Sequence, residues 1–172
     1  MKRVFFTLLL LTSCLTLFVG CNADGEVDGV TVGTNVGNMA PNFIFSDTDN
    51  GMTSINDMKG SPVVLNFWAS WCGPCRAEMP HIQAIYNKYT EEGLYLYAIN
   101  LNETTETVSA FMLEYELSFP VIMDIKQAIS LNYNVSAIPI TFFIDSAGVI
   151  QGKKIGAFAS QESIETYLNA IL

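Results

Sequence analysis

The stretch Trp71-Cys72-Gly73-Pro74-Cys75 carries most of the information about the fold. Its two thiols are separated by two residues, so they can close on each other. Pro74 suits the first turn of a helix, because a missing backbone N–H costs no hydrogen bond there. Cys72 is then expected at a helix N-terminus, where the helix dipole and free N–H groups stabilise a thiolate. Since the thiolate is the form that attacks disulfides, the stretch predicts a redox-active dithiol.

The residues on either side predict a strand before the dithiol and a helix after it. Residues 62–69 form a short apolar run that suits a buried parallel strand. Between Met79 and Tyr89, apolar residues recur at spacings of three and four. This pattern predicts one helix over about 73–91 that ends near Gly93. A strand, a Cys-x-x-Cys motif and a helix in this order are the context of a thioredoxin-like site.

The chain at this point resembles the thioredoxin superfamily, whose active site the stretch 71–75 matches letter for letter. Pro80 falls where that family kinks its active-site helix. Cys75-Arg-Ala-Glu-Met-Pro80, together with the order of elements, resembles the membrane-tethered subgroup of TlpA/ResA-like thiol-disulfide oxidoreductases. The resemblance covers about residues 38–172.

The remaining pattern predicts an α/β fold in which strands and helices alternate. We expect strands near 42–45, 94–100, 119–123, 138–145 and 149–155, and helical segments near 54–60, 103–116, 126–132 and 162–172. This alternation predicts a central mixed, mostly parallel sheet flanked by helices, with an N-terminal hairpin that turns at 49–51 and a central strand–helix insertion. The last two strands are expected to form an antiparallel hairpin.

The N-terminus has the pattern of a targeting segment. Lys2-Arg3 is followed by an apolar run from Val4 to Val19, and then by Gly20-Cys21. This resembles a bacterial lipoprotein signal, which implies cleavage before Cys21 and attachment of lipid to it. We therefore expect a signal peptide at 1–20, a lipidated cysteine and flexible tether at 21–37, and the folded domain at 38–172. An uncleaved signal anchor and a plain secreted protein are the alternatives.

The cysteine count supports a redox role for the pair. Cys14 would leave with the signal peptide and Cys21 would carry lipid, so Cys72 and Cys75 would be the remaining thiols. A structural disulfide that bridges so few residues constrains the unfolded chain only weakly. A zinc site needs further ligands, and His81 is the one histidine of the sequence. We expect no metal and no cofactor.

Composition excludes two other classes of protein. Apolar residues make up 50% of the chain and charged residues 15%, which excludes general disorder. The formal net charge is −9 with only 8 lysines and arginines and no basic cluster, so we expect no nucleic-acid partner.

The resemblance assigns roles to the residues of the site. Cys72 is expected to be the exposed, attacking thiolate, and Cys75 the deeper thiol that resolves the mixed disulfide. Gly73 and Pro74 form the active-site loop between them. Trp71 is expected to pack beside the dithiol, to shield it and to contact the substrate.

Two more positions carry over from the family. Ile138 and Pro139 are expected to be joined by a cis peptide bond and to present backbone to an extended substrate. The alternative is a trans proline at the entry of a strand. Glu78 lies three residues past Cys75, where the subgroup has an acid, while Asn66 takes the place of the buried aspartate of classical thioredoxins. A partly buried Glu78 would have a raised pKa and could exchange protons with Cys75, whereas a solvated helix residue is the alternative.

These residues together predict an extracytoplasmic thiol-disulfide oxidoreductase that is held at the cell membrane by a lipid anchor. The Gly-Pro pair resembles reducing members of the family. The resemblance implies a disulfide-bearing protein substrate such as apocytochrome c, a membrane thiol-reducing electron donor, and action as a monomer. One alternative is a thiol peroxidase, although Ala69 stands where such enzymes have a threonine. The other is a lipid-anchored binding module whose dithiol is incidental.

Overall fold

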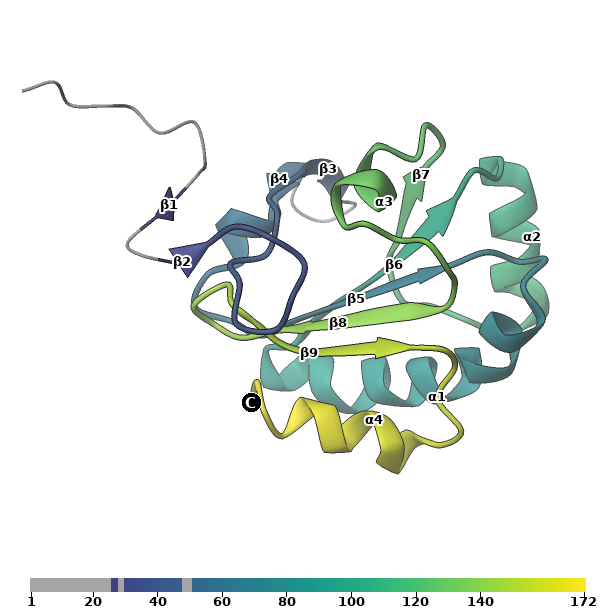
Figure 1. Cartoon of the computed structure of the whole chain (residues 1–172). Coiled ribbons are helices and arrows are strands. Elements are labelled where there is room, and N and C mark those ends of the chain that lie inside the picture. Colours follow the sequence, from purple (N-terminus) through teal and green to yellow (C-terminus); the bar gives the residue numbers. More distant parts are fainter. Residues whose placement is uncertain (1–25, 28–29, 48–50) are drawn as a thin grey trace, which may run out of the picture.

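The structure is a computed structural model that describes residues 26–27, 30–47 and 51–172. A five-stranded sheet with the order β7-β6-β5-β8-β9 forms its centre (Figure 1). The strands are β5 (Val63–Trp68), β6 (Tyr95–Leu101), β7 (Val121–Asp124), β8 (Ile140–Ile144) and β9 (Ile150–Ile155). The β5–β6 and β6–β7 pairs are parallel, whereas β5–β8 and β8–β9 are antiparallel. The predicted α/β fold with a mixed sheet is confirmed.

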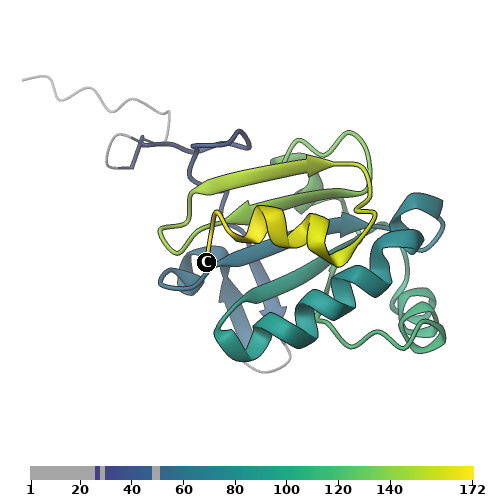
Figure 2. The same cartoon turned by 90° about the horizontal axis from the view of Figure 1, so that it is seen from below.

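Helices and a hairpin cover the two faces of this sheet. Figure 2 shows α1 (Gly73–Tyr89) and α4 (Gln161–Leu168) across one face. Helix α2 (Thr105–Glu114) adds Val108 and Phe111 to the same apolar core. The opposite core includes residues of the β3–β4 hairpin and of the segments that flank it. The remaining elements are β1 (Glu26–Val27), β2 (Val30–Thr31), β3 (Ile44–Asp47), β4 (Gly51–Ser54), α3 (Ala128–Asn132) and the short 3₁₀ helices η1 (Ile55–Met58) and η2 (Thr90–Glu92).

Strand β5 explains why the sequence before the dithiol is continuously apolar. All six of its residues are buried, because cores lie on both sides of it. Val64 and Trp68 belong to the core beneath α1, whereas Leu65 and Phe67 belong to the opposite core. Side chains alternate along a strand, so Asn66 faces α1.

The predicted order of elements is confirmed, with ends that shift by a few residues. Helix α4 begins after Ser160, which caps it: the Ser160 hydroxyl accepts a hydrogen bond from the Ser163 N–H at 3.3 Å. The helix ends at Leu168, earlier than predicted. Tyr95, an aromatic residue that opens β6 at the end of the sheet, is 38% exposed and so lies outside the core.

The described N-terminal segment is packed against the domain. The Gly37 N–H donates to the Ile150 carbonyl at 2.8 Å, and the Ile150 N–H donates to the Asn38 carbonyl at 2.9 Å. Thr34 is buried. Backbone pairing with β9 therefore holds residues that the sequence assigned to the flexible tether, and the folded part begins before residue 38. The predicted signal peptide and Cys21 lie outside the described residues, as do residues 48–50 of the predicted hairpin turn.

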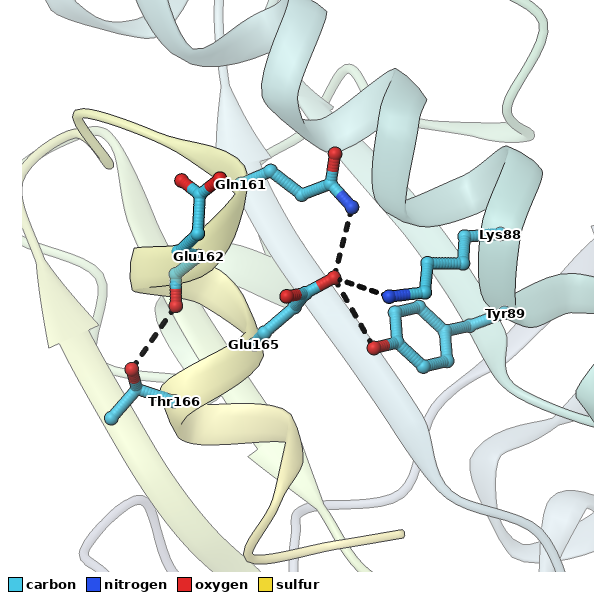
Figure 3. Close-up of polar contacts among 6 residues, drawn as sticks. All are labelled: Lys88, Tyr89, Gln161, Glu162, Glu165 and Thr166. Atoms are coloured by element: carbon cyan, nitrogen blue, oxygen red, sulfur yellow. Dashed lines mark hydrogen bonds and ion pairs between the residues drawn. The ribbon is translucent and has the colours of Figure 1, made fainter.

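Helices α1 and α4 meet through an apolar contact with a polar rim. Ile164 and Leu168 of α4 are fully buried in the core that α1 covers. At the rim, Glu165 accepts hydrogen bonds from Lys88 at 2.8 Å, from Gln161 at 2.9 Å and from the hydroxyl of Tyr89 at 3.3 Å (Figure 3). Within the described part of the chain, no helix is long and apolar enough to cross a membrane.

Candidate active site

The two cysteines of the motif lie at the start of α1, just after the loop that follows β5. A disulfide joins Cys72 and Cys75, with an S–S distance of 2.08 Å and a Cα–Cα distance of 5.2 Å. Cys72 is the N-cap residue of α1, and its Sγ accepts a hydrogen bond from the Cys75 N–H at 3.2 Å. The first turn of the helix thus directs a backbone donor at this sulfur. An N–H donor and the positive end of the helix dipole both favour negative charge on Cys72 when the pair is reduced.

The two cysteines differ only slightly in solvent exposure. Cys72 is 6% exposed and Cys75 is fully buried. The predicted order of exposure is therefore correct, but Cys72 is itself largely covered. Trp71, by contrast, is 71% exposed. The expectation that Trp71 packs closely beside the dithiol is wrong, because most of this residue lies in solvent. This residue instead lines a surface hollow of about 460 Å³ together with Leu101, Gln127 and Ile138, among others.

The Ile138–Pro139 segment lies directly against the dithiol. Its peptide bond is cis, as the resemblance predicts. The Cys72 Sγ is 3.8 Å from the carbonyl oxygen of Ile138. Because Pro139 precedes β8 and Cys72 follows β5, the antiparallel pairing of these strands brings the two segments together. The structure therefore unites the predicted dithiol, Ile138 and Pro139 in one site, with Trp71 at its edge.

Glu78 is a buried carboxyl on the inner face of α1. Its side chain is fully buried, which excludes the alternative of a solvated helix residue. Oε1 accepts a hydrogen bond from Asn66 Nδ2 and Oε2 accepts one from the Phe158 N–H, both at 2.9 Å. Burial raises the pKa of Glu78 above its ordinary value, although these two hydrogen bonds and the charge of Lys154 oppose the shift. Glu78 lies one helical turn from Cys75, as the spacing of three residues requires.

A second acid holds the loop between β5 and the dithiol, and the sequence reasoning did not find it. Glu103 accepts hydrogen bonds from the Ser70 N–H and from Asn100 Nδ2, both at 2.7 Å, and from the hydroxyl of Ser70. Ser70 immediately precedes Trp71. The available signal was topological, since Asn100 lies near the carboxyl end of β6, which runs parallel to β5.

The other polar residues near the site have contacts of their own. Arg76 is exposed and donates a hydrogen bond to the hydroxyl of Tyr115, over whose ring its guanidinium lies. His81 is half-buried on α1. Among the residues that the structure describes, no group of three or more histidine, cysteine, aspartate or glutamate side chains could hold a metal ion.

Comparison with known proteins agrees with this geometry. The model of the AhpC/TSA family matches residues 36–153. Thiol-disulfide oxidoreductase ResA of Bacillus cereus is 37% identical over 174 residues, which cover 99% of this chain and 96% of that protein. ResA of Bacillus subtilis (strain 168) is 35% identical over 135 residues, which cover 78% of this chain and 75% of the relative.

Solved structures extend the agreement to the fold. A Chlorobium tepidum structure described as a thiol:disulfide interchange protein DsbE superposes with a TM-score of 0.72 and 32% identity, and covers 81% of this chain and 99% of its own. StoA from Bacillus subtilis gives a TM-score of 0.65 and 28% identity, over 74% of this chain and 96% of its own. The chain therefore belongs to the AhpC/TSA family, within which it is a thiol-disulfide oxidoreductase of the ResA-like, thioredoxin-fold kind.

Proposed function

We propose that this oxidoreductase works as a reductase of protein disulfides, with Cys72 as the attacking thiolate, Cys75 as the resolving thiol and Glu78 as a proton acceptor. The observation that carries the proposal is the position of Cys72. Its sulfur caps the N-terminus of α1 and lies 3.8 Å from the Ile138 carbonyl oxygen, beside the backbone that would align an extended substrate.

The first step is attack on the substrate. The Cys72 thiolate attacks one sulfur of the substrate disulfide, and the substrate S–S bond breaks as the Cys72–substrate bond forms. The other substrate sulfur leaves as a thiolate and takes a proton from solvent. The N–H of Cys75 and the dipole of α1 stabilise the attacking thiolate before this step. Trp71, Ile138 and Pro139 form the surface against which the substrate chain lies.

The second step regenerates the enzyme disulfide. Cys75 loses its proton to the Glu78 carboxylate, and its thiolate attacks the Cys72 sulfur of the mixed disulfide. The bond between Cys72 and the substrate breaks, and the second substrate sulfur leaves with the electron pair. Two electrons have then moved from the enzyme dithiol to the substrate disulfide. Because Cys75 and Glu78 are both fully buried, the proton transfer takes place away from bulk water.

The Gly73-Pro74 pair favours the reducing direction by resemblance to reducing members of the superfamily. The substrate class that fits best is a protein with a Cys-x-x-Cys disulfide, such as an apocytochrome c before haem attachment. A thiol-reducing transporter of the membrane would restore the dithiol. The leader, with lipid on Cys21, would hold the domain outside the cytoplasm at the membrane surface, where it would act as a monomer.

The direct test is reduction of an insulin disulfide by the domain, with the Cys72→Ser variant as its matched control. We expect activity in the parent and a loss of at least about a hundredfold in the variant, since Cys75 is fully buried and is poorly placed to attack the substrate itself. The Cys75→Ser variant should instead accumulate mixed disulfides with substrates in cells. Retention of full activity by Cys72→Ser would contradict the proposal. Consumption of peroxide without a thiol partner would favour the peroxidase alternative, and a stable complex that survives Cys72→Ala would favour the binding module.

A further inference from the structure

Two neutral polar side chains lie buried between the sheet and Glu78. Asn66 on β5 and Thr141 on β8 are directly opposite each other in the antiparallel register. Both are fully buried, and both side chains face α1. Asn66 Nδ2 donates to Thr141 Oγ1 at 3.0 Å and to Glu78 Oε1 at 2.9 Å. A continuous hydrogen-bonded path therefore runs from β8 through β5 to the carboxyl on α1.

The contacts fix which way the Asn66 amide points. An amide group has two N–H donors, and here one goes to Thr141 and the other to Glu78. On the other side of the same amide, Oδ1 is buried and has no hydrogen-bond partner among the described residues. An unpartnered buried oxygen costs free energy, so the two donor contacts must decide the orientation. Thr141, as an acceptor, holds the donor side of the amide toward Glu78.

We infer that Thr141 and Asn66 form a positioning relay that sets the proton affinity of Glu78. Asn66 stabilises the carboxylate by donating to it at every pH, which an aspartate at this position could not do once ionised. Thr141 makes this donation effective, because loss of its acceptor would free the amide to rotate. The catalytic consequence of the relay, an acceptor for the Cys75 proton, rests on the proposed function.

Among the described residues, three other groups lie around the Glu78 carboxyl, and none of them is a side-chain hydrogen-bond donor to it. Lys154 on β9 is the charged group whose field acts on the carboxyl, and it lowers the pKa less than the two hydrogen bonds do. The backbone N–H of Phe158, before α4, is the second donor. On α1 itself the neighbouring titratable group is Cys75. The Phe158 donor belongs to the main chain, so Asn66, held by Thr141, is the side-chain donor through which the sequence sets the hydrogen bonding of this carboxyl.

The test is to follow the Glu78 carboxyl carbon by ¹³C NMR as a function of pH in the oxidised protein, in which neither Cys72 nor Cys75 titrates. Glu78→Gln identifies the signal. Asn66→Ala should raise the midpoint by about one pH unit, which is the order expected for one hydrogen bond to an ionised group. Thr141→Val should raise it in the same direction by a smaller amount.

Two controls separate the relay from a general effect of substitution. Thr141→Ser keeps the acceptor oxygen and should retain the parental midpoint. Thr166→Val makes the same chemical change on the exposed face of α4, where Thr166 Oγ1 donates to the Glu162 carbonyl at 3.0 Å, and should also leave the midpoint in place. The relay is overturned if Asn66→Ala and Thr141→Val lower the melting temperature but leave the Glu78 midpoint unchanged. Thr141→Val keeps the volume of the side chain and so keeps the test open if Asn66→Ala does not fold.

The proposed function is tested by a different measurement, the pH profile of insulin reduction. In insulin reduction, Glu78→Gln should change the pH profile if Glu78 accepts the Cys75 proton. An unchanged profile would remove Glu78 from the mechanism, while the carbon signal would still decide whether the relay sets its proton affinity. In the Glu78→Gln background, Thr141→Val should have no further effect on the profile, and an additive effect would contradict action through Glu78.

Discussion

At the scale of single residues, Glu78 combines burial with partners that favour its charge. Its two oxygens each accept one hydrogen bond, from Asn66 and from Phe158, and no solvent reaches them. Burial disfavours the charged carboxylate more strongly than these two hydrogen bonds favour it, so the pKa of Glu78 is raised. The pKa of Glu78 is therefore closer to the pKa of a thiol than the pKa of a solvated glutamate is.

This raised pKa makes folding stability depend on pH. Between the ordinary value near 4.5 and the raised value, the folded protein binds more protons at Glu78 than the unfolded chain does. The free energy of unfolding should therefore fall as pH rises through that window. Glu78→Gln removes the titration, so the variant should gain stability relative to the parent as pH rises. Urea unfolding of both oxidised proteins from pH 4 to about pH 8 measures the difference, and a constant difference across this range would contradict the shift.

At the scale of elements, helix α1 carries the chemistry while neighbouring elements hold it in place. Its N-cap is the sulfur of Cys72, which ties the start of the helix to the reactive pair. Pro80 lies inside the helix, where it removes one backbone donor, one turn after the cysteines. The inner face of α1 buries Met79, Ile82 and Ile85. The dithiol is thus mounted on a rigid, deeply packed support.

Helix α4 should owe its attachment to α1 to the apolar contact and not to the polar rim. Ile164→Ala should lower the free energy of unfolding by about 2–5 kcal/mol, since the residue is fully buried. Glu165→Gln should have little effect, because the Lys88–Glu165 pair lies in solvent and keeps a hydrogen-bond acceptor after the change. Thermal unfolding of the two variants checks the ranking. A larger loss for Glu165→Gln than for Ile164→Ala would show that the rim holds the helices together.

At the scale of the whole molecule, the sheet separates two cores, and the N-terminal segment closes the edge of one. Residues 37–38 pair with Ile150 of β9, and Ala40 is buried in the core opposite α1. The hydroxyl of Tyr133 donates to the Pro41 carbonyl at 2.7 Å, which fastens the same segment to the far side of the domain. The segment is therefore part of the folded unit.

Removal of residues from the N-terminus should lower the stability of the domain only when it extends past Thr31. A chain that begins at Thr31 keeps all these contacts and should unfold at the same temperature as a longer one. A chain that begins at Asn42 loses the pairing with Ile150, the partner of Tyr133 and the burial of Ala40, and should be less stable by several kcal/mol, on the order of 1 kcal/mol for each lost contact. Calorimetry of the two chains measures the loss. Equal melting temperatures would mean that the segment contributes nothing to the fold.

The sequence predicts those features that depend on local pattern. The strand at 63–68, the helix from 73 and the cis bond before Pro139 all follow from short motifs or a family motif. The sequence does not predict features that depend on contacts between distant parts of the chain. Thr141 has no local signal as a partner of Glu78, because only the pairing of β8 with β5 brings them near the same amide.

The same limit explains the errors. Residues 22–37 look like a tether because they lack apolar periodicity, yet Gly37 at the end of this stretch pairs with β9 through its backbone, which needs no periodicity. The sequence also predicts that Trp71 packs beside the dithiol, whereas most of this residue lies in solvent. Its exposure of 71% depends on where the loop after β5 turns, which the sequence does not specify.

The recess around Cys72 limits the shape of what can react. Cys72 is only 6% exposed, and its sulfur lies 3.8 Å from the Ile138 carbonyl oxygen, so a substrate disulfide has little open surface through which to reach this sulfur. A cystine that lies flush with the surface of a folded protein cannot reach it without a collision between the two surfaces. A cystine on a protruding or unfolded segment can. If the enzyme works as a reductase, we therefore expect it to spare the disulfides of folded proteins and to reduce those of chains that are not yet folded.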